Sequence, residues 1–169
     1  MIKSPIETRQ SVRRGAVAGL AAGIFLSLMM TAMSAAGGQD IWYGFKGAAA
    51  PFFGTRAMQP GFDVLPVIVG IVCHLAISAI WGALFALVVE GWNRTMTALA
   101  GILWGFVVWI GMYYIVLPVV GLSSMQNDAP VGRAIAFHLM FSVVMTAVYL
   151  LYPVIFPRGP RLHRSVHAV

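Results

Sequence analysis

The stretch VLPVIVGIVCHLAISAIWGALFALVV, residues 64–89, decides the fold class, because it runs for 26 residues without a charged side chain. A helix needs about 20 apolar residues to cross a hydrocarbon core about 30 Å thick. Three further stretches also lack Lys, Arg, Asp and Glu: 15–39, 95–127 and 134–157. Strands that cross lipid must close into a barrel with alternating apolar and polar side chains, a pattern that is absent. The sequence therefore predicts an all-α integral membrane protein with four transmembrane helices in a bundle, near 15–37, 65–90, 95–118 and 132–155.

The composition excludes several classes of protein. Of 169 residues, 60% are hydrophobic and 9% are charged, whereas soluble domains average about 45–50% apolar and about 25% charged residues. So few charges cannot cover the large surface of a small soluble protein, and disorder requires low hydrophobicity. A single cysteine, Cys73, excludes an internal disulfide and a CxxC redox or zinc motif. A soluble enzyme and a disordered chain are both excluded.

The net charge of +6 follows the membrane topology. Four spans place both termini on one side. That side holds eight of the eleven basic residues: Lys3, Arg9, Arg13, Arg14, Arg94, Arg158, Arg161 and Arg164. The other side holds Lys46, Arg56 and Arg133. The positive-inside rule then predicts a multi-pass protein of the bacterial inner (cytoplasmic) membrane with cytoplasmic N- and C-termini. The charge does not indicate a nucleic-acid partner.

The first predicted span resembles a secretory signal peptide in part, because Arg13 and Arg14 precede an apolar run that ends near Ser34. The hydrophobic region of a signal peptide is about 7–15 residues long. The apolar run of this span is longer. We therefore predict a retained helix. The predicted organisation is a single transmembrane domain, 1–157, followed by a basic cytoplasmic tail, 158–169.

The connection between the first two spans, residues 38–64, is long and contains many aromatic residues. Trp42, Tyr43 and Phe52 are interleaved with the cations Lys46 and Arg56. Aromatic residues with a few cations are typical of the lipid headgroup interface. Two interpretations stay open: an interfacial hairpin that anchors the bundle, which we favour, and a lid over the outer mouth.

An internal duplication is indicated by matching segments in the two halves. The second and fourth spans align without gaps at HLAIS, residues 74–78, and HLMFS, residues 138–142. The first and third spans correspond at AGLAAG, residues 18–23, and AGILWG, residues 100–105. Each copy contains two helices and returns to its starting side, so both copies have the same orientation. This predicts two tandem helical hairpins related by a pseudo-two-fold axis along the membrane normal, with halves at 15–90 and 95–155.

Glycines recur at four-residue spacing on two of the predicted helices. Gly15, Gly19 and Gly23 lie on the first, and Gly101 and Gly105 lie on the third. This spacing lines one helix face with small residues and lets helix backbones approach closely in lipid. We predict that these glycines pack helices within the bundle, and a homodimer face is the alternative.

His74 and His138 are the histidines inside the predicted spans, and they occupy matching positions of the two repeats. Ionisable groups in a membrane are costly and often functional. Under the predicted two-fold axis, the two imidazoles lie at one depth and point toward each other. Ser78 and Ser142 follow at i+4, on the same helix face as each histidine.

Three interpretations of the histidine pair stay open. In the favoured one, each imidazole donates a hydrogen bond to a neighbouring helix and fixes the helix register. In the second, His74 and His138 are axial ligands of a b-type haem, with Ser78 and Ser142 as supporting polar groups. In the third, the pair binds a metal ion or relays protons. The third is weakest, because a catalytic metal usually has three protein ligands.

Certain groups that catalysis or transport would need are missing. The four uncharged stretches offer no Asp or Glu within the membrane to couple an ion gradient. Neither a phosphate-cradling loop nor a dinucleotide motif is present. A Ser–His pair on one helix also lacks an orienting acid. The sequence therefore favours a non-enzymatic protein.

The motifs are similar to those of a known family. A His-x-x-x-Ser helix, a Gly-x-x-x-Gly helix that ends in LPVVGL at 117–122, and a second His-Leu helix resemble the YagU-like small inner-membrane proteins of bacteria. The resemblance covers the last three spans, and the first loop departs from it. It implies a four-helix inner-membrane protein and carries over no catalytic residues.

We therefore expect a non-enzymatic accessory or scaffold component of a membrane assembly. The expected partners are the lipid bilayer and either membrane proteins or further copies of the chain. The alternative is a b-haem electron-transfer subunit, and a small transport protein is the third interpretation.

Overall fold

The structure is a computed structural model, and it describes residues 5–123 and 130–155. This part of the chain is helical and contains no strand. Its long helices are α1 (Pro5–Ala36), α3 (Val64–Val88), α4 (Arg94–Gly111) and α6 (Val131–Ile155). Shorter elements are α2 (Tyr43–Phe53), a 3-10 helix (Gly54–Arg56), a π-helix (Met112–Val116) and α5 (Leu117–Val119). The predicted all-helical class is confirmed.

Four helical segments are long and apolar enough to cross a membrane: Thr8–Ala36, Val64–Val88, Arg94–Val119 and Val131–Ile155. The third comprises α4, the π-helix and α5, which follow one another without a break. Each segment has 25 to 29 residues, so its length exceeds the requirement of about 20. The prediction of four apolar helices is therefore confirmed, and the predicted tail at 158–169 lies outside the described residues.

Helix α1 begins ten residues before the predicted start of the first span, at Pro5. The sequence prediction placed that start directly after the last charged residue before the apolar run. Charges such as Arg13 and Arg14 end an apolar stretch, but they do not interrupt helical hydrogen bonding. At 1.5 Å per residue, the 32 residues of α1 extend about 48 Å, so its polar first turns project beyond the hydrocarbon.

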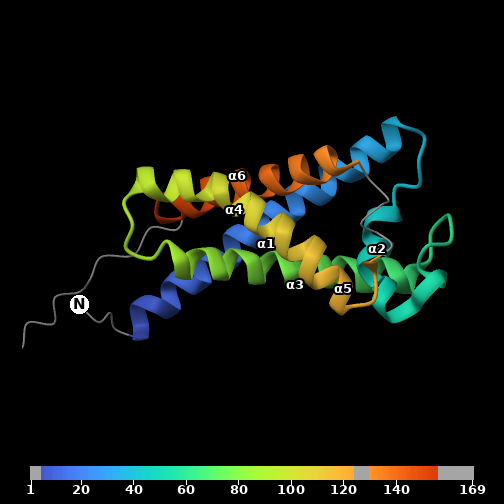
Figure 1. Ribbon diagram of the computed structural model, residues 1–169, viewed down its shortest axis with the longest axis horizontal. Helices are drawn as coiled ribbons and strands as arrows, with labels where there is room; N and C mark the ends of the chain where they lie inside the picture. The colour runs from blue at the N-terminus through green and yellow to red at the C-terminus, as the bar shows by residue number, and fades with distance from the viewer. Residues whose placement is uncertain (1–4, 124–129, 156–169) are drawn as a thin grey trace, which may run out of the picture.

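The long helices lie side by side around an apolar core (Figure 1). Helix α1 packs against α3 and α6, α4 packs against α6, and α2 packs against α3. The backbones of α3 and α4 approach less closely, and aromatic side chains fill the space between them. Trp104 of α4 contacts Trp81 and Phe85 of α3, with ring centroids 6.1 and 5.6 Å apart. Phe85 is fully buried and also contacts Tyr149 of α6.

The glycines of α1 form its contact with α3. A Cβ at Gly15 would collide with the carbonyl oxygen of Gly82, and one at Gly19 would collide with that of Ser78. A Cβ at Gly23 would lie 2.5 Å from the Ser78 hydroxyl oxygen. Only hydrogen therefore fits at these positions, and the two helices touch through their backbones.

The glycines of α4 occupy corresponding positions against α6. Gly101 faces Thr146, and Gly105 faces His138 and Leu139. In the alignment of the predicted repeats, Thr146 corresponds to Gly82, which faces Gly19. The contact of Gly105 with Leu139 likewise corresponds to that of Gly23 with Leu75. Equivalent positions of the two predicted hairpins thus make equivalent contacts, while the pseudo-two-fold axis itself stays a prediction.

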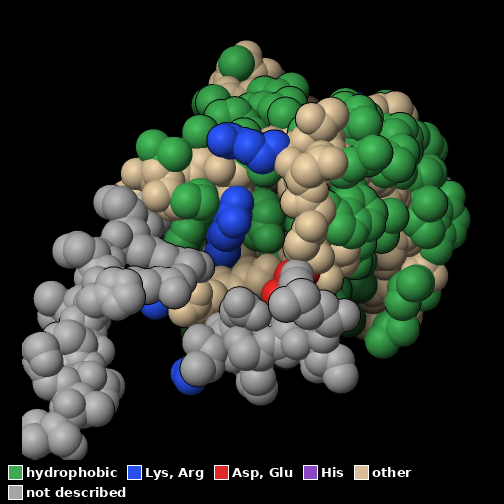
Figure 2. Space-filling model, turned by 90° about the vertical axis from the view of Figure 1, so that its left-hand side faces the viewer, with side chains coloured by type: hydrophobic (Ala, Val, Ile, Leu, Met, Phe, Trp, Pro, Cys, Tyr) green, Lys and Arg blue, Asp and Glu red, His purple; other side chains and the backbone are tan. Residues whose placement is uncertain are grey.

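The two ends of the molecule differ in character. At one end, which we call the cap end, residues 37–63 form a folded segment, the cap, that contains α2 and the 3-10 helix (Figure 1). The opposite end, which we call the basic end, carries the α3–α4 turn. Figure 2 looks onto the basic end and shows basic side chains gathered there, one of them within a hollow.

We predict that Gly19→Leu strongly destabilises the α1–α3 contact, because the side chain would have to displace backbone rather than a flexible side chain. Overpacking costs about 1–3 kcal/mol even where neighbours can adjust, so the loss should reach the upper end of this range. Unfolding in mixed micelles at increasing SDS content measures it. Gly132→Leu is the matched control, because a Cβ there meets no atom within 4 Å. Equal midpoints for the two variants would contradict the prediction.

Candidate functional site

His74 of α3 faces α1. Its Nε2 lies 3.2 Å from the carbonyl oxygen of Gly23, and the side chain is half-buried. Ser78, one turn further along α3, donates a hydrogen bond of 2.7 Å to the His74 carbonyl oxygen. The same hydroxyl lies against Gly23. The polar groups of this helix face therefore join α3 to α1.

His138 of α6 faces the end of the third span. Its Nδ1 lies 2.7 Å from the carbonyl oxygen of Ala134, one turn earlier in the same helix. Its ring makes an edge contact with Tyr113 of the π-helix, with centroids 5.9 Å apart. A π-helix shifts the register of side chains within a helix and often marks a functional position. Nothing in the composition of residues 112–116 indicated this irregularity.

The two histidines thus have different surroundings. Within the described part of the chain, no hydrogen bond or ring contact joins the two imidazoles. His74 contacts the glycine face of α1, whereas His138 contacts its own helix and an aromatic ring. Ser142 is fully buried, and its hydroxyl has no hydrogen-bond partner among the described residues. Ser78 is also buried but is hydrogen bonded, so the two serines differ as well.

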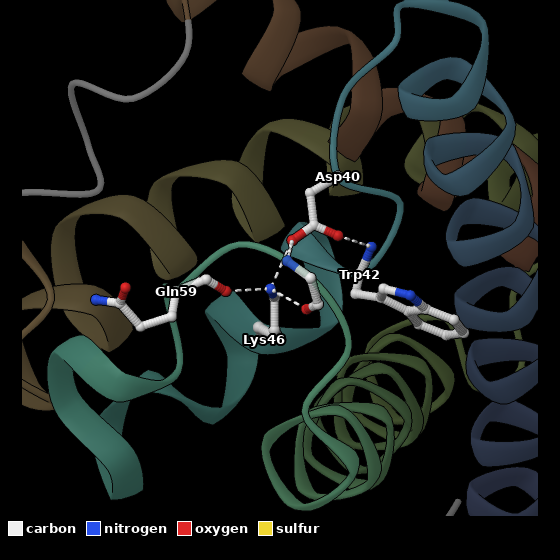
Figure 3. Close-up of polar contacts among 5 residues, drawn as sticks. Asp40, Trp42, Lys46 and Gln59 are labelled. Carbon is white, nitrogen blue, oxygen red and sulfur yellow. Dashed lines mark hydrogen bonds and ion pairs between the residues drawn. The ribbon is translucent and has the colours of Figure 1, made fainter.

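The most completely formed polar site lies in the cap, around Lys46 of α2 (Figure 3). The Lys46 side chain is fully buried. Its ammonium donates to a carboxylate oxygen of Asp40 at 2.5 Å and to the carbonyl oxygens of Gln59 and Gly61 at 2.6 and 2.8 Å. A lysine has three N–H donors, so each donor has an acceptor. The ammonium therefore ties α2 to the segments on both sides of it.

Both carboxylate oxygens of Asp40 also accept hydrogen bonds. One of its oxygens accepts from the backbone N–H of Trp42, and the other accepts from Lys46 and from the N–H of Gly61. Partial burial raises the pKa of Asp40. The hydrogen bonds from Lys46, Trp42 and Gly61 and the positive charge of Lys46 lower it, and the net pKa lies below its usual value of 3.8.

Local sequence explains how the cap folds against the long helices. Gly61 has a φ of 89°, a conformation that favours glycine, and this turn presents both its N–H and its carbonyl to the site. Asp63 caps the first turn of α3 by accepting from the N–H of Leu65. On α3, a Cβ at Gly70 would collide with the carbonyl oxygen of Phe45, so α2 touches α3 through backbone.

The surroundings of Lys46 correct the sequence-based view of this loop. We expected Lys46 to lie with the aromatic residues at the headgroup interface, but it is fully enclosed. Arg56 differs from Lys46, because its side chain is 63% exposed and pairs with Asp63 at 3.1 Å. A run of small residues beside Lys46, Gly47-Ala48-Ala49-Ala50, was the available sign of close packing around it.

The four long apolar helices give the chain the architecture of a multi-pass membrane protein. No known protein family, curated protein or solved structure matches the chain. The resemblance to YagU-like proteins therefore stays a prediction from sequence motifs. Among the described residues, no group of three or more His, Cys, Asp or Glu side chains is placed to hold a metal ion.

We predict that Asp40→Asn opens the cap. Both Asp40 oxygens accept hydrogen bonds, so the amide NH₂ would face a donor whichever way it turns. Breaking a buried ion pair costs about 3–5 kcal/mol, and we expect about 3 kcal/mol because the Asp40 side chain remains 20% exposed. Hydrogen exchange of the Ala57 and Gln59 amides, which are hydrogen bonded to backbone within the cap, measures the loss. Arg56→Gln, which breaks an exposed pair, should cost less than about 1 kcal/mol.

Low pH should also destabilise the cap, because it protonates the Asp40 carboxylate. Its pKa is lower in the folded cap than in the unfolded chain. The stabilisation is therefore fully present above the usual pKa of 3.8 and is lost as the pH falls through the folded value. Protection of the Ala57 and Gln59 amides, relative to the unfolded chain, should be insensitive to this titration in Asp40→Asn. A cap that opens equally at low pH in both proteins would show that Asp40 is not responsible.

Proposed function

We propose that the chain is a non-enzymatic accessory or scaffold component of a membrane assembly, in which the cap is the surface that meets the partner. The observation that carries this proposal is the complete internal pairing of Lys46. A buried cation that turned over substrate or carried ions would need a changing set of partners. Here its three donors hold one conformation of the cap.

The polar groups within the spans support the same function. Ionisable residues inside a membrane commonly form ion pathways or relays. His74 and His138 instead lie within hydrogen-bond distance of the backbone carbonyls of Gly23 and Ala134. The His74 contact joins α3 to α1, and an interhelical contact of this kind contributes about 0.6–2 kcal/mol. The Ala134 carbonyl belongs to the same helix as His138, so the expectation of a hydrogen bond to a neighbouring helix does not hold for His138. The His74 contact gives α1 and α3 a defined register, as a scaffold requires.

The outer surface of the cap is suited to contact another apolar surface. Tyr43, Phe52 and Phe62 are 43%, 68% and 61% exposed. Phe62 also packs on Trp42 at a centroid separation of 5.0 Å. Because the Lys46 site fixes the backbone of the cap, these exposed rings are held in defined positions. Aromatic residues are enriched where protein surfaces meet.

The location proposed for this function is the bacterial inner membrane, with the termini and the basic end in the cytoplasm. The excess of basic residues near the termini and the α3–α4 turn supports this orientation. In this arrangement the cap faces the opposite side. A partner would therefore be a membrane protein with an exposed outer surface, or another copy of the chain.

Site-specific photo-cross-linking tests the proposal. We expect a photoreactive amino acid at Phe52 to form one discrete protein adduct in native membranes. The same group at Leu103 of α4, which is equally exposed at 66%, should form lipid adducts. Asp40→Asn should remove the adduct from position 52 by opening the cap. Absence of any protein adduct from 43, 52 and 62, with a solitary chain in mild detergent, would refute the proposal.

A b-haem subunit with His74 and His138 as axial ligands is the second candidate. The observation that favours it concerns His138, whose Nδ1 contact with a backbone carbonyl is the usual arrangement of a histidine that ligates through its other nitrogen. His74 would need to release Gly23, because its Nε2 is the nitrogen that faces that carbonyl.

Visible spectroscopy separates the two candidates. For the scaffold, we expect protein from haem-replete cells to be colourless before and after dithionite. A Soret band that disappears in both His74→Ala and His138→Ala would establish the haem subunit instead. A band that survives both substitutions would exclude this histidine pair as the ligands.

A further inference from the structure

Two cavities meet between α4 and α6 at the basic end. One has a volume of about 290 Å³ and is lined by polar and aromatic residues, among them Arg14, Arg94 and Tyr149. The other has a similar volume of about 290 Å³, and its lining is almost entirely apolar. Leu150 lines both, so the two cavities are neighbours, one with polar groups in its wall and the other apolar. We call the pair the cleft.

The polar cavity combines three sources of positive potential. Arg14 comes from α1, and Arg94 is the first residue of α4. The start of α4, an 18-residue helix, adds the positive end of its dipole. Among the described residues that line this cavity, none is acidic. An anion is therefore the complementary ligand.

The position of Arg14 is fixed by α6. Its Nε donates a hydrogen bond of 2.6 Å to the Tyr149 carbonyl oxygen, and its guanidinium carbon lies 3.9 Å from the centre of the Tyr149 ring. These contacts hold the positive charge of Arg14 at the cavity wall. Binding to such a prearranged group avoids the entropy cost of ordering a long side chain.

The apolar cavity continues along the surface that faces lipid. Ala98, Gly101 and Ala147 contribute small side chains to its wall, and Ile102 and Val143 at its edges are about half exposed. Thr146 also lines it. The Thr146 hydroxyl is buried and has no hydrogen-bond partner among the described residues. That hydroxyl faces Gly101, so the groove itself presents an apolar surface of small side chains, which suits an acyl chain.

The spacing along α4 matches a lipid molecule. From Arg94 to Gly101 the helix rises about 10 Å at 1.5 Å per residue. Trp92, half exposed in the α3–α4 turn, lines the polar cavity, and tryptophan is enriched at the headgroup level of membranes. The polar cavity therefore lies at the headgroup level, and the apolar groove lies in the hydrocarbon.

We propose that this cleft binds one anionic glycerophospholipid, with its phosphate against Arg14 and Arg94 and an acyl chain in the α4–α6 groove. Basic pockets between transmembrane helices are known to receive anionic headgroups. The proposal is independent of any protein partner at the cap, because the cleft lies at the opposite end of the molecule.

Native mass spectrometry of the full chain in neutral detergent tests the proposal. We expect phosphatidylglycerol to bind about ten-fold or more tightly than phosphatidylcholine with the same acyl chains, since each basic residue near an anionic lipid contributes about five-fold. Arg94→Gln should weaken phosphatidylglycerol binding about five-fold. Arg133→Gln, the same charge change at the cap end, should leave it unchanged. Equal affinities for the two lipids, or equal effects of the two substitutions, would overturn the proposal.

Two further binding experiments distinguish a lipid ligand from a simple anion. Ala98→Phe should block the groove and weaken phosphatidylglycerol binding, whereas Leu99→Phe, at an exposed neighbour outside the lining, should not. Glycerol 3-phosphate should fail to compete with the lipid at equal concentration. Full competition by glycerol 3-phosphate, or no effect of Ala98→Phe, would reduce the site to a phosphate site and overturn the lipid assignment.

Discussion

The close approach of α1 to α3 is the constraint on which the other contacts depend. In lipid, apolar side chains gain little by leaving one apolar environment for another, so helices associate through tight packing and polar contacts. At Gly15, Gly19 and Gly82 the two backbones touch with no side chain between them. This short separation places the Gly23 carbonyl within reach of His74 and seats Ser78 against α1. A larger residue at these positions would separate the helices and remove the polar contacts together with the packing.

The cap depends on the same pair of helices, because residues 37–63 connect the end of α1 to the start of α3. A connection of this length could adopt many conformations if only its ends were fixed. Two contacts limit them: the backbone of Phe45 rests on Gly70 of α3, and the Lys46 ammonium gathers Asp40, Gln59 and Gly61. Burying a charge is unfavourable unless every donor is satisfied. The site therefore selects one cap conformation more strongly than it adds net stability.

The features that depend on local composition could be predicted from the sequence alone. Uninterrupted apolar stretches locate the four long helices, because a membrane span requires length and apolarity and little else. The burial of Lys46 could not be read in this way, because two of its three acceptors lie 13 and 15 residues away and are backbone atoms, which leave no trace in side-chain identity. The surroundings of His74 and His138 depend on how each helix is rotated about its axis. Matching sequence positions indicate a common depth, but they do not determine which neighbour each imidazole meets.

One difference between the two predicted hairpins lies beside the apolar groove. In their alignment, Gly82 of α3 corresponds to Thr146 of α6. Gly82 lets α3 close onto α1 with backbone contact, whereas the Thr146 side chain fills the equivalent space opposite Gly101. Gly105 still meets the backbone of α6 at Leu139, so the difference is local to Gly101. Gly101 and Thr146 both line the apolar groove. The groove therefore borders the position at which a side chain takes the place of backbone in the contact between the two helices.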